Sequence, residues 1–238
     1  MELTLSRTSL QNGYPIEKTR RIAIIGAGGK TSLAQDLAED ELDQHRNVVF
    51  TTTTHLAKHE VIGALESDFP ADLSGVVTVA REDEKNKKKL TNPDETVLSR
   101  VLREINDRII VEADGARGRL LKVHRSFEPV IPEPIDAVTM VINLNSIGRK
   151  ARDEVVHTRD RWEEVIGKTS SIQPRNIERL ILKSSGYRVP DHLQQIVTFV
   201  ISRQKFETIN SILKQFSEEF WGRFNDYLVK SGKKLYRV

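Results

Sequence analysis

Short apolar runs alternate along this chain with stretches whose apolar residues recur every three or four positions. There are six such runs, and most of them are rich in Val and Ile and apolar on both faces, which is typical of strands in a parallel sheet that is covered by helices. These runs are Ile22–Ile25, Val48–Phe50, Val76–Val79, Ile109–Val111, Val138–Leu144 and Ile196–Ile201.

The stretches between the runs predict four helices, because their apolar residues form one stripe at helical spacing. The predicted helices are Ser32–Gln44, Asp94–Asn106, Arg175–Ser185 and Gln204–Phe220. The last one carries an aromatic stripe, which we interpret as packing on the sheet; the alternative is an exposed face for a partner protein. The stripe consists of Phe206, Ile209, Leu213, Phe216 and Phe220.

Strands that alternate with helices predict an α/β fold with a three-layer, doubly wound and mostly parallel sheet. Residues 1–20 precede the first predicted strand, so we expect them to form a short N-terminal appendage. Residues 21–238 contain no obvious linker or repeat and are expected to form a single domain.

Composition narrows the possible functions. The 238 residues are 38% hydrophobic, which supports a packed core, and the chain has no cysteine, which excludes a disulfide scaffold and a thiolate site. Neither a membrane span nor a secretory signal is present, so we expect a cytoplasmic protein without a membrane partner. The net charge is only +3 and aromatic residues make up 6%. The one dense basic run, Lys85–Lys89, lies beside acidic residues and is interpreted as a solvated loop, so no nucleic-acid partner is expected.

The segment Ile22–Ser32 predicts a site for nucleotide phosphates. It reads as an apolar strand, a glycine-rich turn and a Lys-Thr pair that opens a helix, and its candidate ligand-binding residues are Gly26, Ala27, Gly28, Gly29, Lys30, Thr31 and Ser32. Glycines turn backbone N–H groups toward an anion, the lysine reaches the β- and γ-phosphates, and the threonine hydroxyl can bind Mg²⁺. The loop is two residues shorter than G-x-x-x-x-G-K-[ST] and resembles the ATP loop of Mur-type ligases. The alternative is a glycine-rich turn without a ligand; a third glycine in register for a dinucleotide is missing.

Two further polar segments follow predicted strands, where the ligands of a parallel sheet bind. After the second strand, Thr53 and Thr54 are candidate substrate contacts, although threonine also simply suits a strand. After the fourth strand, Glu112 and Asp114 are candidate Mg²⁺ ligands together with Thr31, because Mg²⁺ prefers oxygen donors. The alternative is that these two acids cap a loop.

Several cations and one histidine are candidates for binding a second, anionic substrate. Arg117, Arg119 and Lys122 either hold such an anion or the transferred phosphoryl group, or are ordinary surface cations. His157 lies in the polar segment Arg149–Arg159, which is either a mobile substrate lid or an ordinary exposed loop.

Four motifs in this order, GAGGKTS, TTTTH, EADGARGRLLK and EPVIP, resemble the selenium-dependent hydroxylase accessory protein family (YqeC-like) from Ile22 to His157. The resemblance implies a P-loop NTPase fold and a cytosolic role in maturing a selenium-containing molybdenum hydroxylase, with no assigned reaction. One departure is Phe127, where the family often has a histidine. The residues carried over are Gly26, Gly28, Gly29, Lys30, Thr31, Thr53, Thr54, His55, Glu112, Asp114 and Arg117.

The leading hypothesis is an enzyme that binds Mg²⁺ and ATP and either transfers or hydrolyses the γ-phosphoryl group. Lys30 would clamp the phosphates, Asp114 or His55 would position the nucleophile, and the acceptor would be water or a small anion held by the candidate cations and His157. GTP is less expected, because no Asn-Lys-x-Asp element follows the strand Ile196–Ile201. The alternative is a nucleotide-gated accessory protein with little turnover, which docks on a maturation partner.

Overall fold

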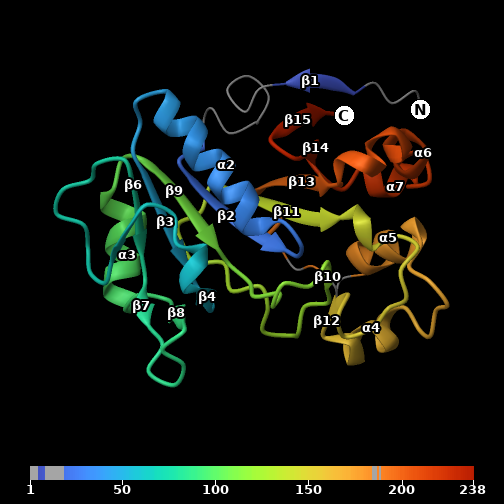
Figure 1. The fold of residues 1–238 in the computed structure, drawn as a ribbon, viewed down its shortest axis with the longest axis horizontal. Helices are drawn as coiled ribbons and strands as arrows, with labels where there is room; N and C mark the ends of the chain where they lie inside the picture. Colours follow the sequence, from blue (N-terminus) through green and yellow to red (C-terminus); the bar gives the residue numbers. More distant parts are fainter. Residues whose placement is uncertain (1–4, 9–18, 184–186, 188) are drawn as a thin grey trace.

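A ten-stranded sheet is the centre of the molecule, as far as the structure describes it (Figure 1). The computed structural model describes residues 5–8, 19–183, 187 and 189–238. The strands of this sheet are β1 (Ser6–Thr8), β2 (Arg21–Gly26), β3 (Val48–Thr52), β5 (Ala64–Glu66), β6 (Val76–Val79), β9 (Arg108–Glu112), β11 (Ala137–Asn143), β13 (Gln194–Val200), β14 (Asp226–Ser231) and β15 (Lys234–Arg237).

The sheet is mixed, but most of its strand pairs are parallel. The strand order is β1-β15-β14-β13-β11-β2-β9-β3-β6-β5, and only the pairs that involve β15 are antiparallel. All six predicted strands form and become neighbours in the parallel part; Val76–Val79 has the predicted bounds, and the bounds of the other five differ by one or two residues. The predicted α/β class and mostly parallel sheet are therefore confirmed.

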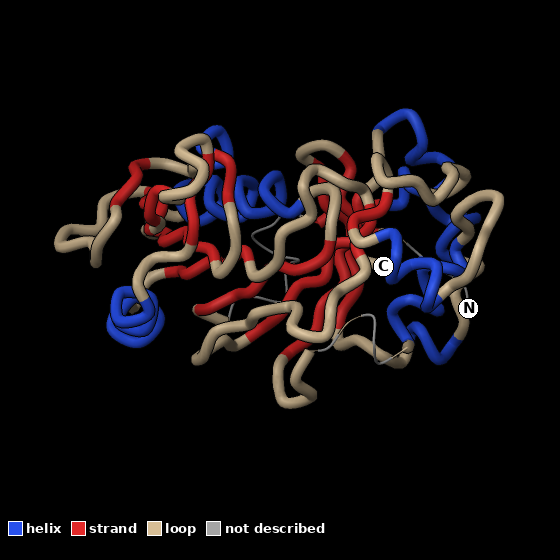
Figure 2. Tube along the Cα trace, turned by 90° about the horizontal axis from the view of Figure 1, so that it is seen from below, coloured by secondary structure: helices blue, strands red, loops and turns tan. Residues whose placement is uncertain are grey.

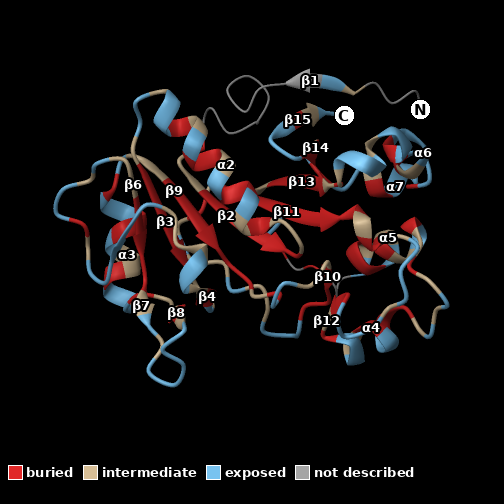
Figure 3. Cartoon of the chain, in the orientation of Figure 1, coloured by how far each residue is buried: buried red, intermediate tan, exposed pale blue. Residues whose placement is uncertain are grey.

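Helices cover both faces of this sheet (Figure 2). They are α2 (Lys30–Asp43), α3 (Glu95–Glu104), α4 (Arg159–Val165), α5 (Pro174–Leu182), α6 (Ile209–Leu213) and α7 (Glu218–Trp221), with 3₁₀ turns η1 (Lys58–Glu60), η2 (Leu144–Ser146) and η3 (Arg203–Thr208). On one face, Leu33 and Leu37 of α2 pack against strand residues such as Phe50. The helices α3 to α7 pack on the other face, and the strands between the layers are buried (Figure 3).

The predicted helix Gln204–Phe220 is wrong as a single element. The segment divides into η3, α6 and α7, because the Ser217 hydroxyl accepts a hydrogen bond from the Phe220 N–H (3.3 Å) and so starts a new helix. The interpretation of its stripe as core is confirmed: Phe216 and Phe220 are buried, with ring centroids 5.7 and 6.1 Å from that of Phe199. A surface made of these rings is not available to a partner.

The C-terminal hairpin of β14 and β15 was missing from the prediction. Of the expected appendage 1–20, Ser6–Thr8 forms β1 and pairs with β15, so this stretch extends the sheet. The expected end of the third helix at Ser185 lies outside the described residues. In the described part of the chain, none of the helices has the length and apolarity that a membrane span requires.

Two small sheets lie beside the large one. One pairs β4 (Leu56–Ala57) with β8 (Lys89–Thr91) and β8 with β7 (Arg81–Glu82); the other pairs β10 (Leu121–Lys122) with β12 (Val156–His157). Because β2, β9 and β3 are parallel neighbours, the segments that follow them meet at one edge of the sheet. This edge brings the glycine loop, the acidic segment and the threonine segment together.

Burial of the aromatic stripe predicts a large loss of stability for Phe220→Ala. Removing this fully buried ring leaves a cavity, and we expect the free energy of unfolding to fall by about 3–5 kcal/mol. Phe127→Ala is the matched control, because its ring is 70% exposed and its loss should change stability by less than about 0.5 kcal/mol. Urea unfolding measures both. Equal effects of the two variants would contradict the packing described here.

Candidate functional site

The loop between β2 and α2 has a backbone shape that requires glycine. Gly26 has φ +96°, and a Cβ atom there would lie 2.2 Å from the carbonyl oxygen of Val141. Gly29, with φ +142°, caps the N-terminus of α2, whose first N–H groups have no acceptor within the helix. The Ala27 N–H donates to the Val141 carbonyl at 3.1 Å and holds the loop on β11. The loop therefore presents a fixed helix N-terminus.

The buried carboxylate of Asp114 binds to the base of this loop and to the lysine that follows it. Its Oδ2 accepts a hydrogen bond from the Gly26 N–H at 2.8 Å and lies 2.5 Å from His124 Nε2, while its Oδ1 lies 3.0 Å from Lys30 Nζ. Burial by itself would raise the pKa of Asp114, but the charges of Lys30, His124 and Lys122 hold it well below its usual range. Asp114 is thus a buried anion that ties the loop to the end of β9.

Lys30 bridges the two predicted acids. Its buried ammonium donates to the Gly26 carbonyl at 2.9 Å and lies 3.0 Å from Asp114 and 3.6 Å from Glu112. Burial opposes the charged form, but the two carboxylates raise the pKa of Lys30 above its ordinary value. Lys30 therefore stays protonated at the mouth of the glycine loop.

Oxygen atoms gather around Thr31 at the start of α2. Its Oγ1 is 3.4 Å from Glu112 Oε2 and 3.5 Å from Glu60 Oε1. Burial raises the pKa of Glu112 to about 7, although Lys30 opposes the shift. Hydroxyl and carboxylate oxygens suit Mg²⁺. Within the described ranges, no group of three His, Asp or Glu side chains is positioned to hold a metal ion by itself.

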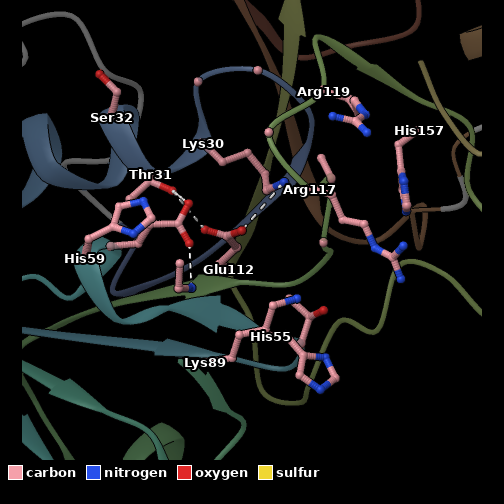
Figure 4. A pocket seen from close by; sticks show the side chains of 18 of the residues that line it. Lys30, Thr31, Ser32, His55, His59, Lys89, Glu112, Arg117, Arg119 and His157 are labelled. Carbon is pink, nitrogen blue, oxygen red and sulfur yellow. Dashed lines mark hydrogen bonds and ion pairs between the residues drawn. The ribbon is translucent and has the colours of Figure 1, made fainter. Parts of the chain in front are cut away.

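These groups line a cavity of about 770 Å³ (Figure 4). Most predicted site residues are brought to its wall, namely Gly28, Gly29, Lys30, Thr31, Ser32, Thr54, His55, Glu112, Arg117, Arg119 and His157. Other residues also line it: His59 and Glu60, which belong to no recognised motif, Asp83, Asn86 and Lys89 from the charged stretch at the Lys85–Lys89 run, and Glu128 from the EPVIP motif. None of them was predicted to lie at this site, and only the fold brings them here.

Five predicted residues lie outside this wall: Gly26, Ala27, Thr53, Asp114 and Lys122. Gly26 and Ala27 form the base of the loop. Asp114 is buried and accepts a hydrogen bond from the Gly26 N–H. The Thr53 hydroxyl donates to the Val130 carbonyl at 2.7 Å instead of facing the cavity. His55 does line the wall, with a 56% exposed side chain whose Nε2 lies 3.2 Å from Asp83.

The structure changes two expectations about the residues that were predicted to bind the second substrate. Lys122, considered as a surface or substrate cation, is fully buried and donates to the Gly115 carbonyl at 2.6 Å and to Glu128 at 2.7 Å. The segment Arg149–Arg159, considered as a lid or an exposed loop, contains β12, whose Val156 and His157 pair with β10. His157 is therefore held by a strand.

Comparison with known proteins identifies related sequences. The profile of a family described as YqeC protein matches residues 22–160, which is more than half of the chain. A protein of Escherichia coli (strain K12), named "Uncharacterized protein YqeC", is 31% identical over 175 residues, which cover 69% of this chain and 68% of the relative. No solved structure gives a significant match.

The raised pKa of Glu112 predicts a pH-dependent effect of Glu112→Gln. A carboxyl that binds its proton more tightly in the folded state stabilises the fold below its ordinary pKa of 4.5, and this contribution is lost as the pH rises through about 7. Between pH 5 and pH 8, the free energy of unfolding of the wild type should fall by up to about 3 kcal/mol relative to that of Glu112→Gln.

Urea unfolding at both pH values measures this difference. Glu84→Gln, which changes an exposed carboxyl, is the control and should show no such dependence. A pH-independent difference between the wild type and Glu112→Gln would contradict the buried, partly neutralised state of Glu112.

Proposed function

The chain belongs to the YqeC family, and on that premise we propose that it is a P-loop NTPase-like protein that binds Mg²⁺ and a nucleoside triphosphate. The loop Gly26–Ser32 would hold the phosphates, and the γ-phosphoryl group would be hydrolysed or transferred. One observation carries the proposal: Lys30 is a buried ammonium held 3.0 and 3.6 Å from two carboxylates, where a glycine loop opens a helix beside a large cavity.

The loop geometry supports phosphate binding. The N–H groups at the start of α2 point out of the helix, and the helix dipole adds partial positive charge there. Lys30 is charged and already positioned, so little side-chain ordering is needed when an anion arrives. The anchors of the loop on Val141 and Asp114 keep these donors in one arrangement.

The donor set at Thr31 fits Mg²⁺. The Thr31 hydroxyl and the Glu112 carboxylate are the proposed ligands, with Glu60 close enough to take part, and phosphate oxygens would complete the shell. When bound, Mg²⁺ would neutralise charge on the β- and γ-phosphates. We assign Asp114 to anchoring the loop, because its oxygens are used by Gly26, His124 and Lys30. His55 remains the candidate for orienting the attacking group from the opposite wall.

ATP is the proposed nucleotide. The chain after β13 reads Ser202-Arg203-Gln204-Lys205 and offers no aspartate for the guanine amino group. An accessory role in maturing a selenium-containing molybdenum hydroxylase follows from the family resemblance alone. A docking role for the aromatic stripe has no support, because Phe216 and Phe220 are buried in the core and the half-buried Phe206 packs against Tyr236, with ring centroids 4.6 Å apart.

Replacing Lys30 tests this proposal. Wild-type protein at an ATP concentration 100 times its Kd, with Mg²⁺ present, should gain about 2.7 kcal/mol of stability, and Lys30→Ala should abolish both this gain and ATP hydrolysis. Thermal unfolding with and without ATP, GTP and Mg²⁺ gives the gain, and phosphate release gives the turnover. Retained turnover in Lys30→Ala would refute the assignment.

Two further variants keep the test interpretable. Lys30→Ala leaves two buried carboxylates without their cation and lowers basal stability, so the gain is measured within each variant. Thr31→Val spares Lys30 and should reduce only the Mg²⁺-dependent part of nucleotide binding. Lys214→Ala, an exposed lysine on the C-terminal segment, is the matched control and should behave like the wild type.

A further inference from the structure

The cavity has two chemically different ends. In Figure 4, Thr31, His59 and Glu112 lie on one side of Lys30, whereas Arg117, Arg119 and His157 lie on the other. The first end contains the phosphate loop and the oxygen donors for Mg²⁺. The second end is formed by the turn Gly115–Arg119 and by His157 of β12, with Gly28 of the loop close to Leu120, and its charges need an explanation of their own.

The carboxylates of the cavity wall already have partners. Glu112 lies 3.6 Å from Lys30, Asp83 lies 3.2 Å from His55, Glu128 lies 2.7 Å from Lys122, and Glu60 accepts the Ala57 N–H at 2.7 Å. By contrast, neither Arg117 nor Arg119 makes a side-chain hydrogen bond or an ion pair with any residue that the structure describes. The two guanidinium groups therefore give this end an uncompensated positive charge.

The positive charges at this end affect the pKa of His157. Burial lowers the pKa of His157, and the positive charges of Lys122, Arg117 and Arg119 lower it further, although the carboxylate of Glu128 opposes the shift. The imidazole is therefore neutral at pH 7 and does not add to the repulsion. A neutral imidazole beside two arginines can both donate a hydrogen bond to an oxyanion and accept one from it.

The turn that carries Arg117 and Arg119 has a defined conformation, which hydrogen bonds fix at both of its ends. Arg117 adopts φ +49°, a left-handed conformation that is uncommon and costly for a residue other than glycine. Lys122 holds the start of the turn through the Gly115 carbonyl, and the Leu120 and Leu121 N–H groups donate to the Val155 carbonyl at 3.0 Å. Strain of this kind persists where the surrounding structure over-determines it, which is common at binding sites.

We propose that Arg117, Arg119 and His157 form a second oxyanion subsite, which binds the carboxylate or phosphate of an acidic small-molecule co-substrate while the nucleotide occupies the first end. The proposal rests on the proposed nucleotide-binding function, because it requires the phosphate loop to be filled by another ligand. Arginine suits the task, since its planar fork donates two parallel hydrogen bonds to either kind of oxyanion. One continuous segment, Glu112–Arg119, would then contact both ligands.

Isothermal titration of nucleotide-loaded protein tests the subsite. Wild-type protein saturated with Mg²⁺ and the non-hydrolysable analogue AMP-PNP, at fixed free Mg²⁺, is titrated with inorganic phosphate and, separately, with malonate. We expect at least one anion to bind and its affinity to fall about tenfold or more in Arg117→Ala/Arg119→Ala, because two charge-assisted contacts are lost. Binding of phosphate alone indicates a phosphorylated co-substrate; binding of malonate alone indicates a carboxylic acid.

The controls separate this proposal from its premise. Lys205→Ala/Lys214→Ala removes the same charge from exposed positions outside the cavity and should leave both affinities unchanged. The proposal is overturned if neither anion binds, if the arginine variant binds it as tightly as the wild type, or if that variant loses AMP-PNP affinity to the same extent. If wild-type protein does not bind AMP-PNP, the proposed function fails and the subsite proposal fails with it; if AMP-PNP binds but neither anion does, only the subsite proposal fails.

Discussion

The buried carboxylate of Asp114 is the interaction on which the rest of the site depends. A charge taken out of water is tolerated only when partners compensate it, and Asp114 receives the Gly26 N–H, the Lys30 ammonium and His124. These contacts join β2, the start of α2 and the segment after β9. The same carboxylate therefore fixes the shape of the glycine loop and the position of the lysine at its mouth.

Local signals made the first half of the site predictable from sequence. The apolar strand, the glycines and Lys30 are contiguous, so their arrangement needs no knowledge of the rest of the fold. Glu112 was predictable for a similar reason, because it ends a buried strand. The difference in role between Glu112 and Asp114 was not predictable, since Asp114 lies two residues beyond the end of β9 and its carboxylate accepts a hydrogen bond from the Gly26 N–H.

Tertiary context decided what local pattern could not. Lys122 looked like one of three similar cations, but the fold buries it completely and uses it to hold the neighbouring turn. Glu60 carries no motif and reaches the site through a 3₁₀ turn after β4. Buried Lys122 and exposed Arg117 thus differ through position alone, and that difference leaves the arginines free to meet a ligand.

A crystal structure of the protein with Mg²⁺ and AMP-PNP tests the central claim most directly. We expect the β- and γ-phosphates to lie on the N–H groups from Gly28 to Thr31, with Lys30 Nζ within hydrogen-bond distance of a phosphate oxygen. Nucleotide bound elsewhere, or a glycine loop without phosphate at saturating AMP-PNP, would contradict it.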